Sequence, residues 1–290
     1  MKVYIVGHKG WIGQMFCNQF KKNNVEICYS NFRAESDEIK EDILNKKATH
    51  LLCCMGRTHG TLNGKKFTTI DYLEHNETLP INLNDNLYSP LSLAHFCDKH
   101  NIHMTYIGTG CIFLYDEQHT IENNVGFTED DNPNFFGSNY SIVKGYTDRL
   151  IKNTNALNLR IRMPITNKSN PRNFITKITT YEKICSIPNS MTVLDELIPV
   201  AHQMMKNNET GTFNLTNPGK ISHNQILEMY KELVDHSFTW KNFTVEEQDK
   251  VLLGKRSNNL LNTEKLESKY KVNNIFDSVR NTLTNFQLDD

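Results

Sequence analysis

A glycine-rich turn near the N-terminus constrains the fold of this chain more than any other feature. The apolar residues 3–6 lead directly into Gly7-His-Lys-Gly10-Trp-Ile-Gly13, and apolar residues at helical spacing continue through Phe20. In such a strand–turn–helix unit, Gly7 permits the tight turn and Gly13 lets the helix pack closely on the strand. Gly10 leaves the backbone open to a phosphate group, which the unpaired N–H groups at the helix N-terminus can bind. A merely flexible loop is the alternative interpretation.

Strands and helices alternate along the rest of the first half. Helical patterns begin near residue 71 and span residues 84–100, between strand-like runs at residues 25–28, 49–55, 104–108 and 159–163. Alternation of this kind predicts an α/β fold, a Rossmann-type doubly wound parallel sheet, whose ligands bind beyond the carboxyl ends of the strands. The glycine-rich turn is then typical of a dinucleotide site. Its expected contacts are Gly7, Lys9, Gly10, Trp11, Ile12, Gly13 and Gly56.

The residues after the second strand indicate which dinucleotide is bound. An NAD site usually places Asp or Glu there for the ribose 2′-hydroxyl, whereas this chain offers Ser30, Asn31 and Arg33. Because these residues suit a 2′-phosphate, the sequence favours NADP(H). Residues 41–43 are expected to form a short strand edge, where Asp42 either contacts adenine or caps a turn.

The second half changes pattern, which predicts a second, smaller lobe. We expect an NADP-binding domain at residues 1–163, to which residues 191–219 return, and a substrate-binding lobe at residues 164–290. In the lobe, Ser222-His-Asn-Gln225 and Thr244-Val-Glu-Glu247 are capping boxes that should open two helices.

Composition excludes several classes of function. Among 290 residues the formal net charge is -1, so no basic field indicates nucleic acid or an anionic membrane as a partner. The seven cysteines are scattered without metal-ligand spacing, which argues against a disulfide framework and a metal site. No signal peptide precedes the first strand and no apolar run is long enough to span a bilayer. We therefore expect a cytoplasmic protein.

Tyr140-Ser-Ile-Val-Lys144 carries the most suggestive chemistry. Residues four apart share a helix face, so the phenol and the ammonium group should lie side by side. The pKa of a free Tyr is about 10, and a neighbouring cation favours the phenolate and moves that pKa toward neutrality. Such a pair also occurs by chance on solvated helix faces, so the pentapeptide alone does not establish a site.

Together with the glycine-rich turn and Thr109, this pentapeptide resembles the extended short-chain dehydrogenase/reductase superfamily. Longer stretches resemble the nucleotide-rhamnose synthase (epimerase-reductase) family: residues 109–113, 163–177, 187–197, 213–219, 222–230 and 256–259. The likeness covers essentially the whole chain. It is looser between residues 25 and 80, where the family motif after the third strand is replaced by Cys53-Cys-Met-Gly-Arg-Thr.

The resemblance implies conversion of a nucleoside-diphosphate 4-keto-6-deoxyglucose into the L-rhamnose nucleotide. Epimerisation at C3 and C5 would use Cys111 and Lys177 as the acid–base pair. Reduction at C4 by NADPH would use Tyr140 as proton donor, Lys144 to lower its pKa and hold the nicotinamide ribose, and Thr109 to hydrogen-bond the C4 oxygen. Three further roles are implied: Asn86 would support Lys144 through water or cap a helix, and Asn173 and Arg256 would bind the diphosphate.

Two other functions remain open at this point. One is a reductase without epimerase activity, as in the deoxythymidine-linked 4-keto-rhamnose reductases. The other is a catalytically silent NADP-binding regulatory subunit, which would have no need of an intact Thr109, Tyr140 and Lys144. The family favours uridine over deoxythymidine as the base, and it implies an upstream 4,6-dehydratase as a pathway partner. It also implies a homodimer formed by the helices at residues 84–100 and 139–153, with Leu87, Leu91, Leu93 and Phe96 available for burial.

Overall fold

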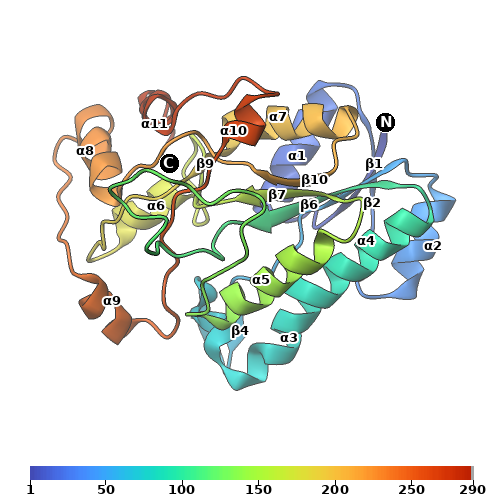
Figure 1. The fold of residues 1–290 in the computed structure, drawn as a ribbon, viewed down its shortest axis with the longest axis horizontal. Helices are drawn as coiled ribbons and strands as arrows, with labels where there is room; N and C mark the ends of the chain where they lie inside the picture. Colours follow the sequence, from blue (N-terminus) through green and yellow to red (C-terminus); the bar gives the residue numbers. More distant parts are fainter. Residues whose placement is uncertain (289–290) are drawn as a thin grey trace. The chain divides into compact units, whose positions relative to one another are not determined.

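The computed structural model describes residues 1–288, and its centre is a six-stranded sheet (Figure 1). The strand order is β10-β7-β6-β3-β1-β2, and β1 pairs in parallel with β2 and β3, as β3 does with β6. The bounds are β1 Lys2–Val6, β2 Glu26–Tyr29, β3 His50–Cys53, β6 His103–Thr109, β7 Leu157–Ile161 and β10 Gly211–Asn214. The predicted Rossmann-type sheet is confirmed.

The strand order reverses between β1 and β3. From β1 the chain moves outward to β2 and then returns past β1 to β3 and β6. A crevice opens at such a switch point, outside the carboxyl ends of the strands. The glycine-rich turn follows β1 and Gly56 follows β3, so both predicted dinucleotide segments lie at this point.

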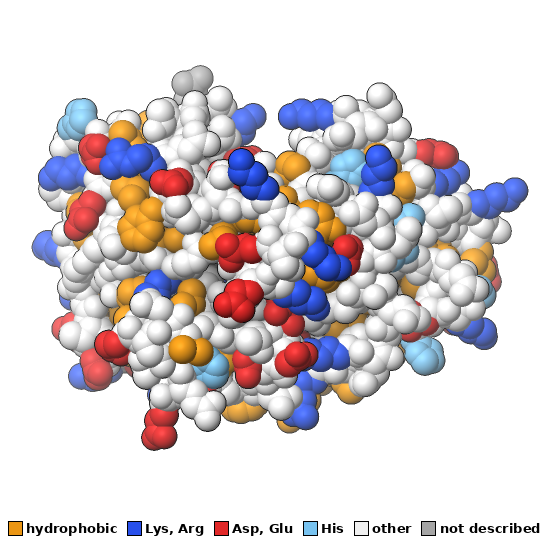
Figure 2. Space-filling model, turned by 45° about the horizontal axis from the view of Figure 1, so that its top comes forward, with side chains coloured by type: hydrophobic (Ala, Val, Ile, Leu, Met, Phe, Trp, Pro, Cys, Tyr) orange, Lys and Arg blue, Asp and Glu red, His pale blue; other side chains and the backbone are white. Residues whose placement is uncertain are grey.

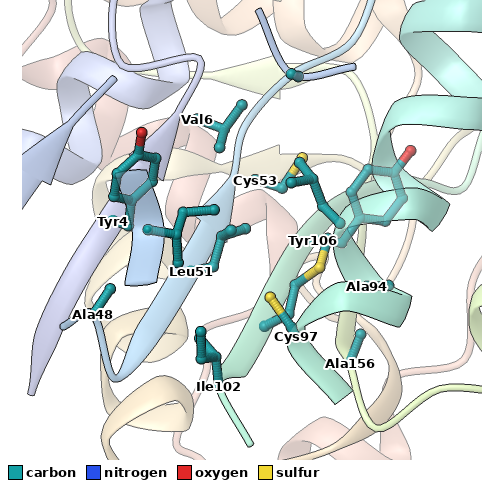
Figure 3. Close-up of a cluster of buried hydrophobic side chains, with 14 of the residues drawn as sticks. Tyr4, Val6, Ala48, Leu51, Cys53, Ala94, Cys97, Ile102, Tyr106 and Ala156 are labelled. Carbon is teal, nitrogen blue, oxygen red and sulfur yellow. The ribbon is translucent and has the colours of Figure 1, made fainter. Parts of the chain in front are cut away.

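Helices cover both faces of the sheet (Figure 1). On one face, α2 (Asp37–Asn45), α4 (Ser89–Lys99) and α5 (Asn139–Ile151) enclose a cluster of buried side chains, part of which Figure 3 shows. This cluster includes Tyr4, Ile39, Ile43, Leu51, Cys53, Leu93, Ala94, Met104 and Tyr106. On the other face, α1 (Trp11–Lys22) contacts α7 (Leu194–Lys206), with the rings of Phe20 and His202 5.1 Å apart. Burial of these apolar side chains drives the layers together.

The first half contains one secondary-structure expectation that was wrong and one element that was not predicted. Residues 41–43 are not a strand edge but part of α2, because Ile39 and Ile43 share one helix face and are fully buried. Residues 60–67 form an unexpected hairpin of β4 (Gly60–Leu62) and β5 (Lys65–Phe67). Its turn is Asn63-Gly64, and both residues have positive φ. That dipeptide is a strong hairpin signal which our interpretation overlooked.

The predicted helices near residues 71 and 84–100 are parts of a longer helical run. It comprises η1 (Ile70–Glu74), η2 (Asn76–Thr78), α3 (Leu79–Leu83), the π-turn η3 (Asn84–Tyr88) and α4. Leu93 is fully buried, and Leu91 and Phe96 pack against the same cluster. These three side chains, expected at a dimer interface, are therefore already used by the fold.

The chain separates into two compact units. The first contains residues 1–112, 132–160 and 198–213, and the second contains residues 113–131, 161–197 and 214–290. The sequence predicts a boundary at residue 163 and a returning segment at residues 191–219; in the structure the first unit ends this stretch at residue 160 and resumes at residues 198–213.

The second unit has a buried apolar cluster of its own. Short strands β8 (Pro164–Ile165) and β9 (Thr192–Val193) pair in parallel, and α6 (Phe174–Thr180), α8 (His223–Leu233) and α11 (Ile275–Thr284) contribute to the cluster. The remaining helices are α9 (Val245–Val251) and α10 (Glu264–Glu267). Both predicted capping boxes are confirmed, since Ser222 with Gln225 opens α8 and Thr244 with Glu247 opens α9.

The surface shows neither a single-sign charge patch in the view of Figure 2 nor a membrane-spanning helix within residues 1–288. On the face in Figure 2, Lys and Arg side chains are interspersed with Asp and Glu. None of the helices within residues 1–288 is long and apolar enough to cross a bilayer. Within the same residues, no three His, Cys, Asp or Glu side chains gather as metal ligands would.

Candidate active site

The glycine-rich turn is shaped as a cradle that only glycine allows. Gly7 has a φ of +81° and its carbonyl accepts a hydrogen bond from the N–H of Gly10 (3.0 Å). A Cβ on Gly13 would lie 2.2 Å from the Gly7 oxygen, so any side chain there would push α1 off the turn. Helix α1 begins at Trp11, and its N-cap residue, Gly10, has no side chain that could bind the first N–H groups. The N–H groups at this helix N-terminus therefore fit a dinucleotide pyrophosphate.

The other predicted contacts of the turn surround this cradle. Lys9 is exposed, while Trp11 and Ile12 are half-buried at the start of α1. The rings of His8 and Tyr29 are 4.8 Å apart, which brings the turn against the end of β2. The segment expected to bind a 2′-phosphate therefore begins beside the turn.

That segment is exposed. Asn31 and Arg33 are open to solvent, and Arg33 Nε lies 2.5 Å from Glu35 Oε1. An exposed ion pair is worth little, so a phosphate can compete for the guanidinium group. Asp42 is placed differently from our expectation: its Oδ2 accepts hydrogen bonds from Tyr4 Oη (2.6 Å) and Lys46 Nζ (2.9 Å). Its carboxylate thus ties α2 to β1, and an adenine contact would have to displace these donors.

Tyr140 and Thr109 are brought together at the carboxyl end of β6. Ser138 caps α5 by accepting from the N–H of Ser141, which fixes the first turn where Tyr140 lies. Thr109 ends β6, and its side chain forms a hydrogen bond with Tyr140 and accepts from the N–H of Cys111 (3.1 Å). Burial, and then the nearby Cys111, raise the pKa of Tyr140, whereas the Thr109 hydrogen bond lowers it. The phenol is therefore protonated at neutral pH and ready to donate.

Lys144 does not act on Tyr140 in the way that the pentapeptide led us to expect. Its side chain is buried, and its ammonium group donates a hydrogen bond to the hydroxyl of Tyr106. Burial lowers the pKa of Lys144 to about 8, against the opposing effects of Cys53, Asp148 and Cys111. The pKa of Tyr140 is raised rather than lowered, because burial outweighs the effect of any cation in this state.

Asn86 is held by backbone groups in the π-turn. It is fully buried; its Oδ1 accepts from the N–H of Arg57 and its Nδ2 donates to the Arg57 carbonyl, both at 2.9 Å. It is not a helix N-cap, so that alternative was wrong. Pro90 has no N–H for the carbonyl of Asn86, and Thr147 Oγ1 on α5 donates to that carbonyl at 2.5 Å instead. Such π-turns occur frequently at functional sites; here the turn ties the segment after β3 to α5.

Two positioning contacts at the start of α5 were not foreseen. Glu74 accepts a hydrogen bond from the N–H of Asn139 (2.9 Å), and Asn82 Nδ2 donates to the Asn139 carbonyl (3.2 Å). Both hold the residue immediately before Tyr140. Glu74 lies within residues 25–80, where the family resemblance is looser, and Asn82 follows just after; hydrophobic periodicity does not signal such contacts.

In the second unit, Asn173 has a different task from the predicted one. It is fully buried and caps α6: its Oδ1 accepts from the N–H of Ile175, and its Nδ2 donates to the carbonyls of Thr166 and Lys168, both at 2.8 Å. Binding a diphosphate would break these bonds.

Lys177 lies one turn into α6 and is half-buried. Burial lowers its pKa, and the nearby Arg172 and Arg256 lower it further. Sequence reasoning did not single out Arg172, although it lies in the quoted stretch before α6. Arg256 is half-buried, with Nη1 donating to the Gly254 carbonyl at 2.5 Å. The three cations form a positive cluster suited to an anionic ligand.

The buried Arg162 organises the loops of this unit that lead to Arg256. Its guanidinium group donates to Asn189 Oδ1, to the carbonyl of Ser190 and to Ser257 Oγ. Arg162 is 1% exposed, so a buried side chain anchors the segment that carries Ser257 and Arg256.

Comparison with known proteins identifies the family of the chain. Residues 1–273 match the family described as RmlD substrate binding domain. The solved structure of the L780 UDP-rhamnose synthase from Acanthamoeba polyphaga mimivirus is 48% identical, with a TM-score of 0.93 over 99% of each chain. An Arabidopsis thaliana bifunctional dTDP-4-dehydrorhamnose 3,5-epimerase/dTDP-4-dehydrorhamnose reductase is 44% identical over 92% of this chain and 86% of its own length.

A longer relative from the same plant is also similar. The trifunctional UDP-glucose 4,6-dehydratase/UDP-4-keto-6-deoxy-D-glucose 3,5-epimerase/UDP-4-keto-L-rhamnose-reductase RHM1 is 42% identical over 93% of this chain, which matches 40% of that protein. The resemblance inferred from the sequence is thereby confirmed. The chain belongs to the RmlD substrate binding domain family of the extended short-chain dehydrogenases/reductases.

Proposed function

We propose that this chain is an NADPH-dependent 3,5-epimerase/4-reductase that converts UDP-4-keto-6-deoxyglucose into UDP-L-rhamnose. The observation that carries the proposal is the group at the end of β6, where Thr109 is hydrogen-bonded to Tyr140 and Cys111 follows two residues later. The names of the mimivirus and plant relatives support the reaction class and the rhamnose nucleotide.

The residues of the first unit suit the reduction. When bound, NADPH would supply the hydride at C4. The glycine-rich turn would hold its pyrophosphate, Arg33 its 2′-phosphate and Lys144 its nicotinamide ribose. Tyr140, kept protonated by burial, donates its proton to the C4 oxygen, while Thr109 hydrogen-bonds the same oxygen. The phenolate that remains is stabilised by Thr109 and by the Lys144 ammonium group.

The epimerisation needs a different pair of groups. The C4 ketone acidifies the protons at C3 and C5, so inversion requires a base that removes a proton and an acid that returns one. Lys177 suits the basic role because burial, Arg172 and Arg256 lower its pKa and increase the fraction of neutral amine. Cys111 suits the role of its partner, since a half-buried thiol can exchange a proton.

The substrate and its supply follow from the same chemistry. Arg256 and Arg172 are our candidates for the diphosphate, in place of the fully engaged Asn173. The 4-keto group must be made by a 4,6-dehydratase, an activity that the name of the trifunctional plant relative includes.

One incubation tests the proposal. The purified protein is mixed with UDP-4-keto-6-deoxyglucose and NADPH, absorbance at 340 nm is followed, and the sugar product is identified by NMR. We expect a product of the L-rhamno configuration. Tyr140→Phe should slow reduction by about 10²–10⁴, whereas the matched control Tyr146→Phe, an exposed Tyr of the same helix, should not. A reduced sugar with C3 and C5 unchanged would leave the reductase-only alternative.

A further inference from the structure

A second phenol lies against Lys144. The Lys144 ammonium group donates a hydrogen bond to the Tyr106 hydroxyl and lies 4.5 Å from the centroid of the Tyr106 ring. The two side chains are 4% and 1% exposed, so water does not compete for the contact. In Figure 3 the Tyr106 hydroxyl points away from the other labelled side chains of the cluster. The position reads as ordinary sheet core in the sequence, and no role in the proposed reaction has been given to it.

The contact is built by elements that also carry the reacting groups. Tyr106 lies on β6, three residues before Thr109, and pairs in register with Cys53 of β3. Lys144 lies on α5, one turn after Tyr140, and α5 packs on β6. One strand thus supplies the partner of Tyr140 and the partner of Lys144.

The groups around Lys144 leave Tyr106 as its hydrogen-bonding partner. Those that affect its charge are Cys53 from β3, Cys111 after β6 and Asp148 on α5 itself. Asp148 is bound to Arg160 and Asn158, so its charge is largely committed elsewhere. Burial raises the pKa of Tyr106, which keeps it a neutral phenol. A hydroxyl oxygen and an aromatic face therefore stabilise an ammonium group whose charged form burial disfavours.

We propose that Tyr106 is a positioning residue for the reduction, which holds Lys144 in its charged form one helical turn after Tyr140. The inference rests on the proposed reductase activity but concerns a different residue. Without the Tyr106 hydroxyl, Lys144 would lose its proton at lower pH and could no longer stabilise the phenolate or hold the cofactor ribose.

The test is the pH profile of reduction in Tyr106→Phe, which keeps the ring and removes the hydroxyl. A 4-keto-rhamnose nucleotide is supplied so that epimerisation is bypassed, and kcat/KM is measured from pH 6 to pH 10. The alkaline limb should move to lower pH by roughly 1–2 units, which is the pKa shift expected when one hydrogen bond to a charged group is lost. The control is Tyr4→Phe, which removes a hydrogen-bonded hydroxyl from the same sheet without touching Lys144. Its profile should match that of the unchanged protein.

Two readouts separate this inference from the proposed function. Protein with ¹³C-labelled lysine side chains gives the pKa of Lys144 directly by NMR, without activity, and that pKa should fall in Tyr106→Phe. In the unchanged protein, the Lys144 side chain should show nuclear Overhauser contacts to the Tyr106 ring, a measurement that does not depend on folding of the variant. An unshifted Lys144 pKa, an equal shift in both variants or absence of the contacts would overturn the inference. If the titration shifts but no 4-keto sugar is reduced, the proposed function fails and the contact stands.

Discussion

Removal of Asp148 should destabilise the first unit strongly, because it leaves the buried Arg160 cation without its carboxylate. Asp148 on α5 receives two hydrogen bonds from Arg160 on β7, Nε to Oδ1 at 2.9 Å and Nη2 to Oδ2 at 2.6 Å. Asn158 donates a third to Oδ1 at 2.8 Å. The Arg160 and Asp148 side chains are 0% and 4% exposed. Breaking one side of such a pair costs about 3–5 kcal/mol, a large share of the roughly 5–15 kcal/mol that stabilises a typical domain.

The matched comparison is a double variant in which both charges are removed. Asp148→Ala should lower the free energy of unfolding by about 3–5 kcal/mol, whereas Asp148→Leu combined with Arg160→Met should cost far less, because no charge is left buried. Urea unfolding can be followed by tryptophan fluorescence, with Trp11 reporting on the first unit and Trp240 on the second. A loss below about 1 kcal/mol in Asp148→Ala, or an equal loss in the double variant, would refute the reasoning.

The buried His50, the exposed Arg33 and the exposed apolar side chains of α5 each give a measurable expectation. Burial, followed by the neighbouring His103, lowers the pKa of His50 to about 4. In the unfolded chain a His titrates near 6.5, so the unfolded state binds the proton first as the pH falls. The free energy of unfolding should therefore be unaffected by His50 above pH 6.5 and fall by about 3 kcal/mol toward pH 4. His50→Gln should flatten that slope in urea titrations, and an unchanged slope would contradict the assignment. NADPH should be preferred to NADH, and Arg33→Ala should reduce kcat/KM for NADPH by about tenfold or more, because a charge-assisted hydrogen bond is lost. Equal kcat/KM values for the two cofactors in the unchanged protein would be inconsistent with a 2′-phosphate site. Tyr88 and Leu150, in the two helical segments expected to form a dimer, expose 56% and 46% of their surface. Light scattering should therefore give a dimer mass, which Leu150→Glu converts to a monomer mass. A monomer mass for the unchanged protein at micromolar concentration would argue against a dimer formed by these segments.

Local chemistry explains which parts of the fold could be predicted. The glycine-rich turn was predictable because Gly7 adopts a positive φ and Gly13 meets the nearby backbone of Gly7 and His8 at distances that no side chain allows. The capping boxes at Ser222 and Thr244 were predictable because both partners lie within four residues of each other. In each case the sequence contains the whole interaction.

Interactions between segments distant in sequence were not predictable in the same way. The π-turn at Asn86 depends on Pro90 and on a hydroxyl from Thr147, which only folding brings near. Asn173 matched a family position, yet three backbone partners use its side chain for capping. Tyr106 looked like core, since nothing in its strand indicates that Lys144 points at it.

Solvent-deuterium exchange, read by NMR together with NADPH absorbance, tests the central claim most directly. If Cys111 and Lys177 move protons at C3 and C5 while Tyr140 completes reduction at C4, the two half-reactions should fail independently. Tyr140→Phe should lose reduction by about 10²–10⁴ yet still incorporate deuterium at C3 or C5. Cys111→Ala and Lys177→Ala should each lose exchange at one or both carbons but still reduce a supplied 4-keto-rhamnose nucleotide. Undiminished exchange at C3 and C5 in both the Cys111 and the Lys177 variants would contradict their assignment as the acid–base pair.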